Sequence, residues 1–386
     1  MFRLVNAQLR LAHSQTVVRC TDSTPGKSQD PPLQIDRFST TPSPLEMGRQ
    51  IPQLPPEIII LIVKASLTPY DPFGQALNHA ARYTTLRKFA LLDSIWRGIS
   101  QPLLHEWVMI TGKASALRLL DAARAQGGRI KGAQSLCIFP DSRWKVDFVA
   151  KLLRCVQDAE NVYLYFVQVD VAALAGLPNL RRLSLASVNI KGDDHSVKLQ
   201  IPHLRHLDCD SADIEPYADF FLTPNFLPSL RHFRLHSAEG RWMTFPLIGQ
   251  LSSLSTDTPL LFDYALPASI RLLSLPRSAG ERRQLFRRFA SMPRFLHFAF
   301  SEPGCIVAAL EEQIASKKSG LRVIIMSCGQ ATTELSRKIA DCVRVLEERG
   351  VRFVKGSVKY EHAVKRMEEI LEKERMAVED AAIRGG

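Results

Sequence analysis

The sequence predicts an α/β fold in which an N-terminal helical module leads into an irregular solenoid with a parallel sheet. Two observations predict this architecture. Short apolar segments with a shared spacing recur from about residue 135 onward, and amphipathic helical patterns lie between several of them. Because strands that alternate with helices form parallel sheets, we expect a sheet lined with helices or loops on its convex side.

The first 50 residues are expected to form a disordered leader, because residues 20–50 are rich in Ser, Thr, Pro and Gln. Residues 1–21 contain three arginines and no acidic residue, which is also compatible with a mitochondrial transit peptide. Both interpretations stay open.

A helical module is predicted over residues 51–106, beginning with the run IPQLPPEIIILIVKASL. Pro55 and Pro56 fit the start of a helix, where a missing N–H costs nothing, and Glu57 suits the positive end of the helix dipole. The aliphatic residues that follow supply more apolar surface than one buried stripe needs. The run is also too short for the roughly 20 residues that cross a bilayer, so it predicts a helix covered by another protein rather than by lipid.

Two further helical patterns follow within residues 86–112 and end in a predicted strand at Trp107–Ile110. The apolar residues of the first pattern are expected to pack on the opening helix, and Trp96 continues the same seam. The three helical patterns would form one small module.

The repeated part, predicted over residues 107–357, is clearest in LPNLRRLSL, IPHLRHLDC and LPSLRHFRL. Leu180, Leu204 and Leu230 are equivalent and lie 24 and 26 residues apart. That period falls in the range of leucine-rich repeats, whose unit is a short strand with a helical or irregular return. Weaker copies predict further strands within residues 135–139, 161–166, 250–256, 269–275, 294–300, 320–327 and 351–356.

The last segment, residues 358–386, is predicted to be a capping helix with a tail. Tyr360, Val364, Met367 and Leu371 share one face, and dense mixed charge covers the rest. A terminal cap must be polar on its outer side, so this helix is expected to close the end of the array.

The order of these features resembles that of fungal F-box proteins with leucine-rich repeats. LPPEII, a leucine-rich helix, a Trp-Arg pair and ISQPLLHEWV carry the resemblance over about residues 52–110, although the segment 67–83 lengthens the usual interval. In that family the F-box is a three-helix module that docks onto the adaptor of a cullin-type ubiquitin ligase. The resemblance implies adaptor contacts for Leu54, Pro55, Glu57, Ile58 and Ile62, supported by Leu92 and Trp96. The alternative is that the module only caps the solenoid.

The outward-facing residues of the repeats predict a target-binding surface. Alternate side chains of a strand face opposite ways, so Leu183 points into the core while Arg182 points out. Neighbouring strands lie about 4.8 Å apart, so equivalent residues form columns on the concave side. One predicted column holds Tyr163, Arg182, His206, His232 and His297, and the next holds Tyr165, Ser184, Asp208, Arg234 and Ser274. Tyr and Arg are favoured at binding hot spots, so we expect these columns to be exposed and to bind a protein.

No cofactor, metal ion or catalytic activity is expected. A zinc site from His203, His206 and His232 is disfavoured, because His203 precedes the strand and faces another way and no second acidic ligand is near. The chain lacks GxSxG, HExxH, P-loop and GxGxxG signatures, which argues against an enzyme.

The net charge of +11 is compatible with acidic partners or with solubility alone. Residues 277–294 carry six arginines, with Arg283 and Arg287 on the expected exposed face. Nucleic-acid binding would use such a patch, but no stacking aromatic residues interleave the charge, so a solvated helix is preferred.

These features predict a non-catalytic substrate receptor of a cullin-based ubiquitin ligase, which binds the adaptor and cullin complex and an unknown protein target. Seven scattered cysteines without a CxxC pair favour free thiols in a reducing compartment, and the cytoplasm or nucleus fits this. Two alternatives remain, a repeat scaffold without a ligase role and a basic protein associated with nucleic acid.

Overall fold

The computed structural model describes residues 54–67, 75–192, 198–214, 221–236, 246–256, 266–275, 292–317, 319–327 and 329–385. The chain divides into two compact units, Met1–Gln101 and Pro102–Gly386. The predicted leader lies outside the described residues, as do Arg283 and Arg287 of the arginine-rich segment. No helix in the described part of the chain is long and apolar enough to cross a membrane.

The N-terminal unit contains α2 (Pro56–Ser66), α3 (Gln75–Ala90) and the start of α4 (Ser94–Glu106). Helices α2 and α4 lie where the sequence predicts them, but α3 begins within the segment 67–83 and ends at Ala90, earlier than the predicted pattern. Pro56 occupies the first turn of α2, as expected. The Asp93 carboxylate begins α4 by accepting hydrogen bonds from the Ile95 and Trp96 backbone N–H groups at 2.7 and 2.9 Å. The Phe89 and Trp96 rings stack with their centroids 5.1 Å apart, which joins α3 to α4.

The second unit is built on one parallel sheet of eleven strands. Each strand pairs with the next main strand along the chain, so the sheet grows in one direction. The strands are β1 (Trp107–Ile110), β2 (Ser135–Ile138), β3 (Asn161–Tyr165), β5 (Arg182–Ala186), β7 (His206–Asp210), β9 (His232–His236), β10 (Ser253–Thr256), β11 (Leu272–Leu275), β12 (Phe295–Phe298), β13 (Val323–Met326) and β14 (Arg352–Lys355). Every predicted strand is present, and the parallel sheet is confirmed.

A second, smaller sheet was not predicted. It consists of β4 (Gln168–Asp170), β6 (Asn189–Lys191) and β8 (Asp213–Ile214). The chain reaches it by a sharp corner after each of β3, β5 and β7, where Phe166, Ser187 and Ser211 all have a φ of 53°. This left-handed conformation is uncommon for residues with a side chain, and its repetition at one position marks a recurring turn.

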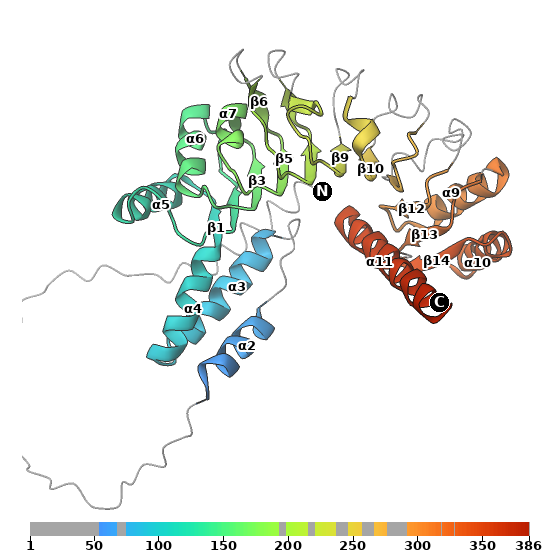
Figure 1. Ribbon diagram of the computed structural model, residues 1–386, viewed down its shortest axis with the longest axis horizontal. Coiled ribbons are helices and arrows are strands. Elements are labelled where there is room, and N and C mark those ends of the chain that lie inside the picture. Colours follow the sequence, from blue (N-terminus) through green and yellow to red (C-terminus); the bar gives the residue numbers. More distant parts are fainter. Residues whose placement is uncertain are drawn as a thin grey trace, which may run out of the picture. The chain divides into compact units, whose positions relative to one another are not determined.

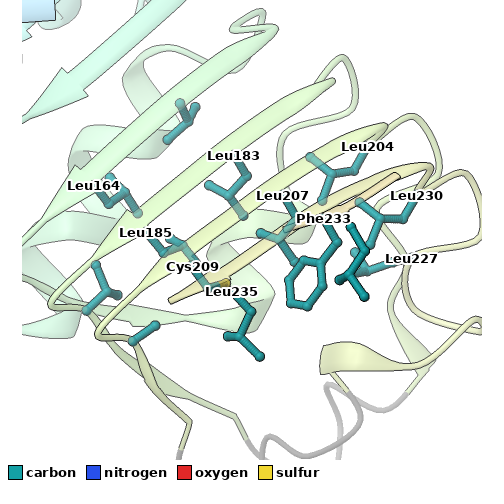
Figure 2. Packing of buried hydrophobic residues seen from close by; sticks show 14 of the residues in the cluster. Leu164, Leu183, Leu185, Leu204, Leu207, Cys209, Leu227, Leu230, Phe233 and Leu235 are labelled. Carbon is teal, nitrogen blue, oxygen red and sulfur yellow. The ribbon is translucent and has the colours of Figure 1, made fainter. Parts of the chain in front are cut away.

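The core lies along one face of the large sheet. Leu183, Leu207 and Phe233 pair directly across neighbouring strands and are almost fully buried. Figure 2 shows them beside the leucines that precede each strand, Leu204 and Leu230 among them. Leu254 and Leu273 continue the ladder on β10 and β11. The inward direction predicted for Leu183 is therefore confirmed, and Leu207, Phe233 and Leu273 extend the same buried ladder.

Helices cover this core face on the outside of the curved sheet, as Figure 1 shows for α6 and α9. The buried cluster includes Val149, Leu152 and Leu153 of α6, the stripe that the sequence predicts. The outer elements are α5 (Lys113–Ala125), α6 (Val146–Cys155), α7 (Val171–Ala175), the 3-10 helix η3 (Pro246–Gln250), α9 (Pro303–Ser316) and α10 (Thr333–Glu348). Of the described cysteines, Cys137, Cys155, Cys209 and Cys342 are buried and Cys305 is partly buried, all as free thiols.

The last helix, α11 (Tyr360–Gly385), packs on the opposite face of the sheet, which we call the inner face (Figure 1). Tyr360, Ala363, Val364, Met367 and Ile370 form a second buried cluster with Leu272, Phe295, Val323 and Ile325 of β11, β12 and β13. The sequence predicts the apolar face of this helix correctly. Its expected place at the end of the array is wrong, because three consecutive strands present large apolar side chains on the inner face and α11 covers them.

Candidate functional site

The inner-face columns follow the predicted register in the middle of the sheet. Arg182 pairs with His206, and His206 pairs with His232. One step further along each strand on the same face, Ser184, Asp208 and Arg234 pair in the same way. The sheet therefore brings these residues from β5, β7 and β9 together.

Three residues stand in a different column from the predicted one. Tyr163 pairs with Ser184 rather than with Arg182, and Tyr165 pairs with Ala186 rather than with Ser184. His297 pairs with Ser274 in the column of Asp208 and Arg234. The physical reason is the period of two in a strand. A shift by two residues keeps every side chain on the same face, so apolar alternation alone cannot distinguish the two alignments.

The expected exposure is also wrong for two histidines and two serines. His232 and Ser184 are 6% and 9% exposed, and His297 and Ser274 are fully buried. The His297 ring lies between the Ser274 hydroxyl, 2.8 Å from Nδ1, and the Ser357 carbonyl oxygen, 2.8 Å from Nε2. Ser357 belongs to the segment that leads into α11, so the C-terminal part of the chain encloses both histidines.

A polar chain joins α11 to the inner face at β9 and β10. The Tyr360 hydroxyl contacts Ser253 Oγ, and Ser253 Oγ lies 2.8 Å from His232 Nδ1. The other ring nitrogen, His232 Nε2, lies 3.3 Å from a Glu368 carboxylate oxygen. The buried imidazole is therefore held on both sides, which fixes its ring orientation.

A second polar cluster lies in the next column. Arg234 Nη1 is 3.3 Å from Asp208 Oδ2 and 3.8 Å from Glu361 Oε1. Burial raises the pKa of Asp208 to about 6, although the Arg234 charge opposes this shift and Asp210 adds to it. Arg234 thus lies between one carboxyl from the sheet and one from the helix.

The inner face beyond α11 keeps the more accessible predicted residues. Arg182 is exposed, while Tyr163, Tyr165, His206 and Asp208 are half-buried. The Tyr165 ring stacks on Phe139 with centroids 4.2 Å apart. The His206 ring stacks on His232 with centroids 4.3 Å apart.

His206 is held in its neutral form. Burial lowers its pKa to about 2, and the charges of His232, Arg182 and Arg205 act in the same direction. A neutral imidazole is a hydrogen-bonding group or a metal ligand rather than a cation at physiological pH.

The buried His297 should make the protein sensitive to acid. Burial lowers the pKa of His297 from 6.5 to about 4; the hydrogen bond to Ser357 opposes the shift and His362 adds to it. Between these values the unfolded chain takes up a proton and the folded chain does not, so stability is full above pH 6.5 and is lost as the pH falls towards 4. We expect His297 to cost about 2 kcal/mol of stability between pH 7 and pH 5.

Urea unfolding of the wild type and His297→Gln at both pH values measures this contribution. Other groups titrate in the same window, among them His236, whose pKa burial lowers to about 3, and Asp208, which acts in the opposite direction. These groups are common to both proteins, so the difference between the two pH dependences isolates His297. Equal losses in both proteins would contradict the prediction.

The residues expected to bind the adaptor all lie in the N-terminal unit. Leu54, Pro55, Glu57, Ile58 and Leu92 are exposed, and Ile62 is exposed at 37%. Trp96 is half-buried against Phe89. Between the exposed residues of α2, Ile59 and Val63 are buried, so α2 has one packed face and one exposed apolar face.

The sequence missed the contribution of α11 to the inner face. Tyr360 contacts Ser253, Glu368 contacts His232 and Glu361 lies near Arg234, each across more than 100 residues of sequence. A signal was present, because Glu361 and Glu368 are seven residues apart and flank the apolar stripe of the helix. The spacing of the apolar residues in this helix does not indicate which surface the apolar stripe would cover.

No protein-family model matches the chain, and no curated protein matches it. Its function therefore has to be inferred from the residues and contacts of the two units.

Proposed function

We propose that the chain is a substrate receptor of a cullin-type ubiquitin ligase, with an F-box in the N-terminal unit and a leucine-rich-repeat solenoid in the second unit. The observation that carries the proposal is the exposed apolar face of α2. Leu54, Ile58 and Leu61 are 46%, 42% and 62% exposed.

Such a face favours a protein partner. The described part of the N-terminal unit is small, yet it also exposes Leu91 and Leu92 at 76% and 61%. Large apolar patches on a soluble protein mark interaction sites, and apolar anchors that become buried in a complex supply much of its affinity. The order in which LPPEII precedes the Trp96 helix and the repeats is the F-box resemblance, and it selects the ligase adaptor as the partner.

Recurring local structure supports the repeat assignment. In three successive units an apolar pair precedes the strand, and the second residue donates its backbone N–H to the first: Leu180 to Leu177, Leu204 to Ile201, and Leu230 to Leu227. In the first two of these units the strand is followed by a left-handed corner, at Ser187 and Ser211. Repeats of this kind present a continuous binding surface, and here the accessible inner face around Arg182 would take the target.

The chain would perform no chemistry itself. Holding a target and the adaptor at once converts ubiquitin transfer into a reaction at high effective concentration. A receptor of this kind acts in the cytoplasm or the nucleus.

Loss of the apolar anchor should abolish adaptor binding. The change is Leu54→Ala with Pro55→Ala, and we expect adaptor recovery in co-purification to fall by about 30-fold, since a hot-spot contact contributes about 2 kcal/mol. The matched control is Leu117→Ala, which removes an equally exposed leucine, at 46%, from α5 in the other unit.

Unchanged adaptor recovery by the double variant would refute the assigned contact. If the wild-type chain recovers neither adaptor nor cullin while Leu117→Ala and the wild type melt alike, the protein is a repeat scaffold without a ligase role.

A further inference from the structure

We propose that His206, His232 and Glu368 form a binding site for a divalent transition-metal ion of borderline softness, of which Zn²⁺ is the representative. The three side chains come from β7, β9 and α11. One ligand atom from each, two imidazole nitrogens and a carboxylate oxygen, lies within 4.8 Å of the other two. Two histidines and one carboxylate with an open position are a ligand set that zinc adopts.

The spacing of one pair already fits a bound ion. His232 Nε2 and the Glu368 oxygen are 3.3 Å apart. Bonds of about 2.1 Å in tetrahedral geometry place two ligand atoms about 3.4 Å apart. The His206 ring stacks on the His232 ring at an interplanar angle of 22°, so their lone pairs do not yet converge on one point. Ion binding therefore requires the half-buried His206 ring to turn one nitrogen towards the ion.

The surroundings orient His232 as a ligand. Its Nδ1 contacts the Ser253 hydroxyl at 2.8 Å, and Ser253 also contacts the Tyr360 hydroxyl. When Nδ1 carries the proton and donates to Ser253, Nε2 presents its lone pair towards Glu368 and His206. Metal-bound histidines nearly always use their second nitrogen in such an outer hydrogen bond.

The protonation states suit a cation as well. His206 is neutral, with a pKa lowered to about 2, and the pKa of Glu368 is lowered first by its hydrogen bond with His232. In that hydrogen bond Nε2 of His232 carries the proton, so a bound ion takes the place of this proton. Arg182 and Arg205 place positive charge nearby, which lowers the affinity of the site for a cation.

An ion here would connect the sheet to the helix that covers it. Because the ligands come from both sides of this contact, binding stabilises the packed position of α11 in proportion to RT ln(1 + [ion]/Kd). The metal site would thus link the ion concentration to the exposure of the inner face. This proposal does not depend on the chain being part of a ubiquitin ligase.

Titration calorimetry of the full chain without a histidine tag, with Zn²⁺ as the only added ligand, tests the site. We expect one ion per chain and a higher melting temperature in its presence. His206→Ala and Glu368→Gln should each lower the affinity at least tenfold, and Ser253→Ala should lower it about tenfold through lost orientation. The matched control is His203→Ala, an exposed histidine three residues from His206, which should leave the affinity unchanged.

Co²⁺ spectra separate this site from binding by thiols, because sulfur ligands give an intense charge-transfer band that nitrogen and oxygen ligands lack. Absence of saturable binding by the wild type, or equal affinity in Glu368→Gln, would overturn the proposal. Loss of Zn²⁺ binding in His203→Ala, or a Co²⁺ spectrum with a thiolate charge-transfer band, would also overturn the proposal. His206→Ala keeps the contact between His232 and Glu368, so it should melt like the metal-free wild type and report on binding alone.

Discussion

Leu207→Asp is expected to unfold the repeats around β7. Leu207 is 2% exposed and pairs with Leu183 on one side and Phe233 on the other. A carboxylate at this position would be buried with no partner, at a cost of several kcal/mol, comparable to a total stability of about 5–15 kcal/mol. Because each repeat is stabilised by its neighbours, the loss should spread along the sheet.

Circular dichroism and thermal melting measure this effect. The matched control is His203→Asp, which introduces the same carboxylate at an exposed position in the turn before β7. The control should melt within a few degrees of the wild type, since surface changes usually alter stability by less than about 0.5 kcal/mol. A wild-type melting curve for Leu207→Asp would mean that this side chain is not in the core.

Met367→Asp is expected to release α11 from the inner face. Met367 is 2% exposed, in the cluster with Leu272 and Phe295. Truncating a buried Met costs about 2–5 kcal/mol, and an unpaired carboxylate adds to that. The helix makes its contacts on one side only, so its packed position should be lost before the strands unfold.

Hydrogen exchange distinguishes local release from global unfolding. In Met367→Asp the amides of α11 should exchange rapidly, while those of β5 and β7 stay protected. Lys365→Asp serves as the control, because Lys365 lies on the exposed side of the same helix. Equal protection of α11 in Met367→Asp and the wild type would contradict the packing described for this helix.

The strands and their core could be predicted because each repeat carries its own local signal. The spacing of Leu180, Leu183 and Leu185 encodes a turn and two inward-facing residues, and the same spacing recurs in the next two units. Burial of these residues follows from the alternation of a strand. The local apolar pattern and the tertiary environment of these residues agree, so the sequence alone is sufficient to predict the strands and their core.

The inner face could be predicted only in part, because it depends on contacts between distant segments. The strand alternation predicts that His232 and His297 face away from the core, and this is correct. Nothing near them in the sequence indicates that α11 covers them. The cover is recognisable only after the apolar stripe of α11 is matched to Leu272, Phe295 and Val323. The predicted columns of Tyr163, Tyr165 and His297 are wrong because alternation is unchanged by a shift of two residues.

The packing of α11 has a consequence for biosynthesis. Ser253 and Tyr360 are 107 residues apart, and Arg294 contacts Glu374 across 80 residues. The ribosome therefore completes β11 and β12 well before it makes the helix that covers them. Neighbouring strands can pair as they emerge, but Leu272 and Phe295 stay bare until translation passes Tyr360. If translation pauses in this interval, the nascent chain exposes these apolar side chains to solvent. Chaperones bind exposed apolar surfaces of this kind.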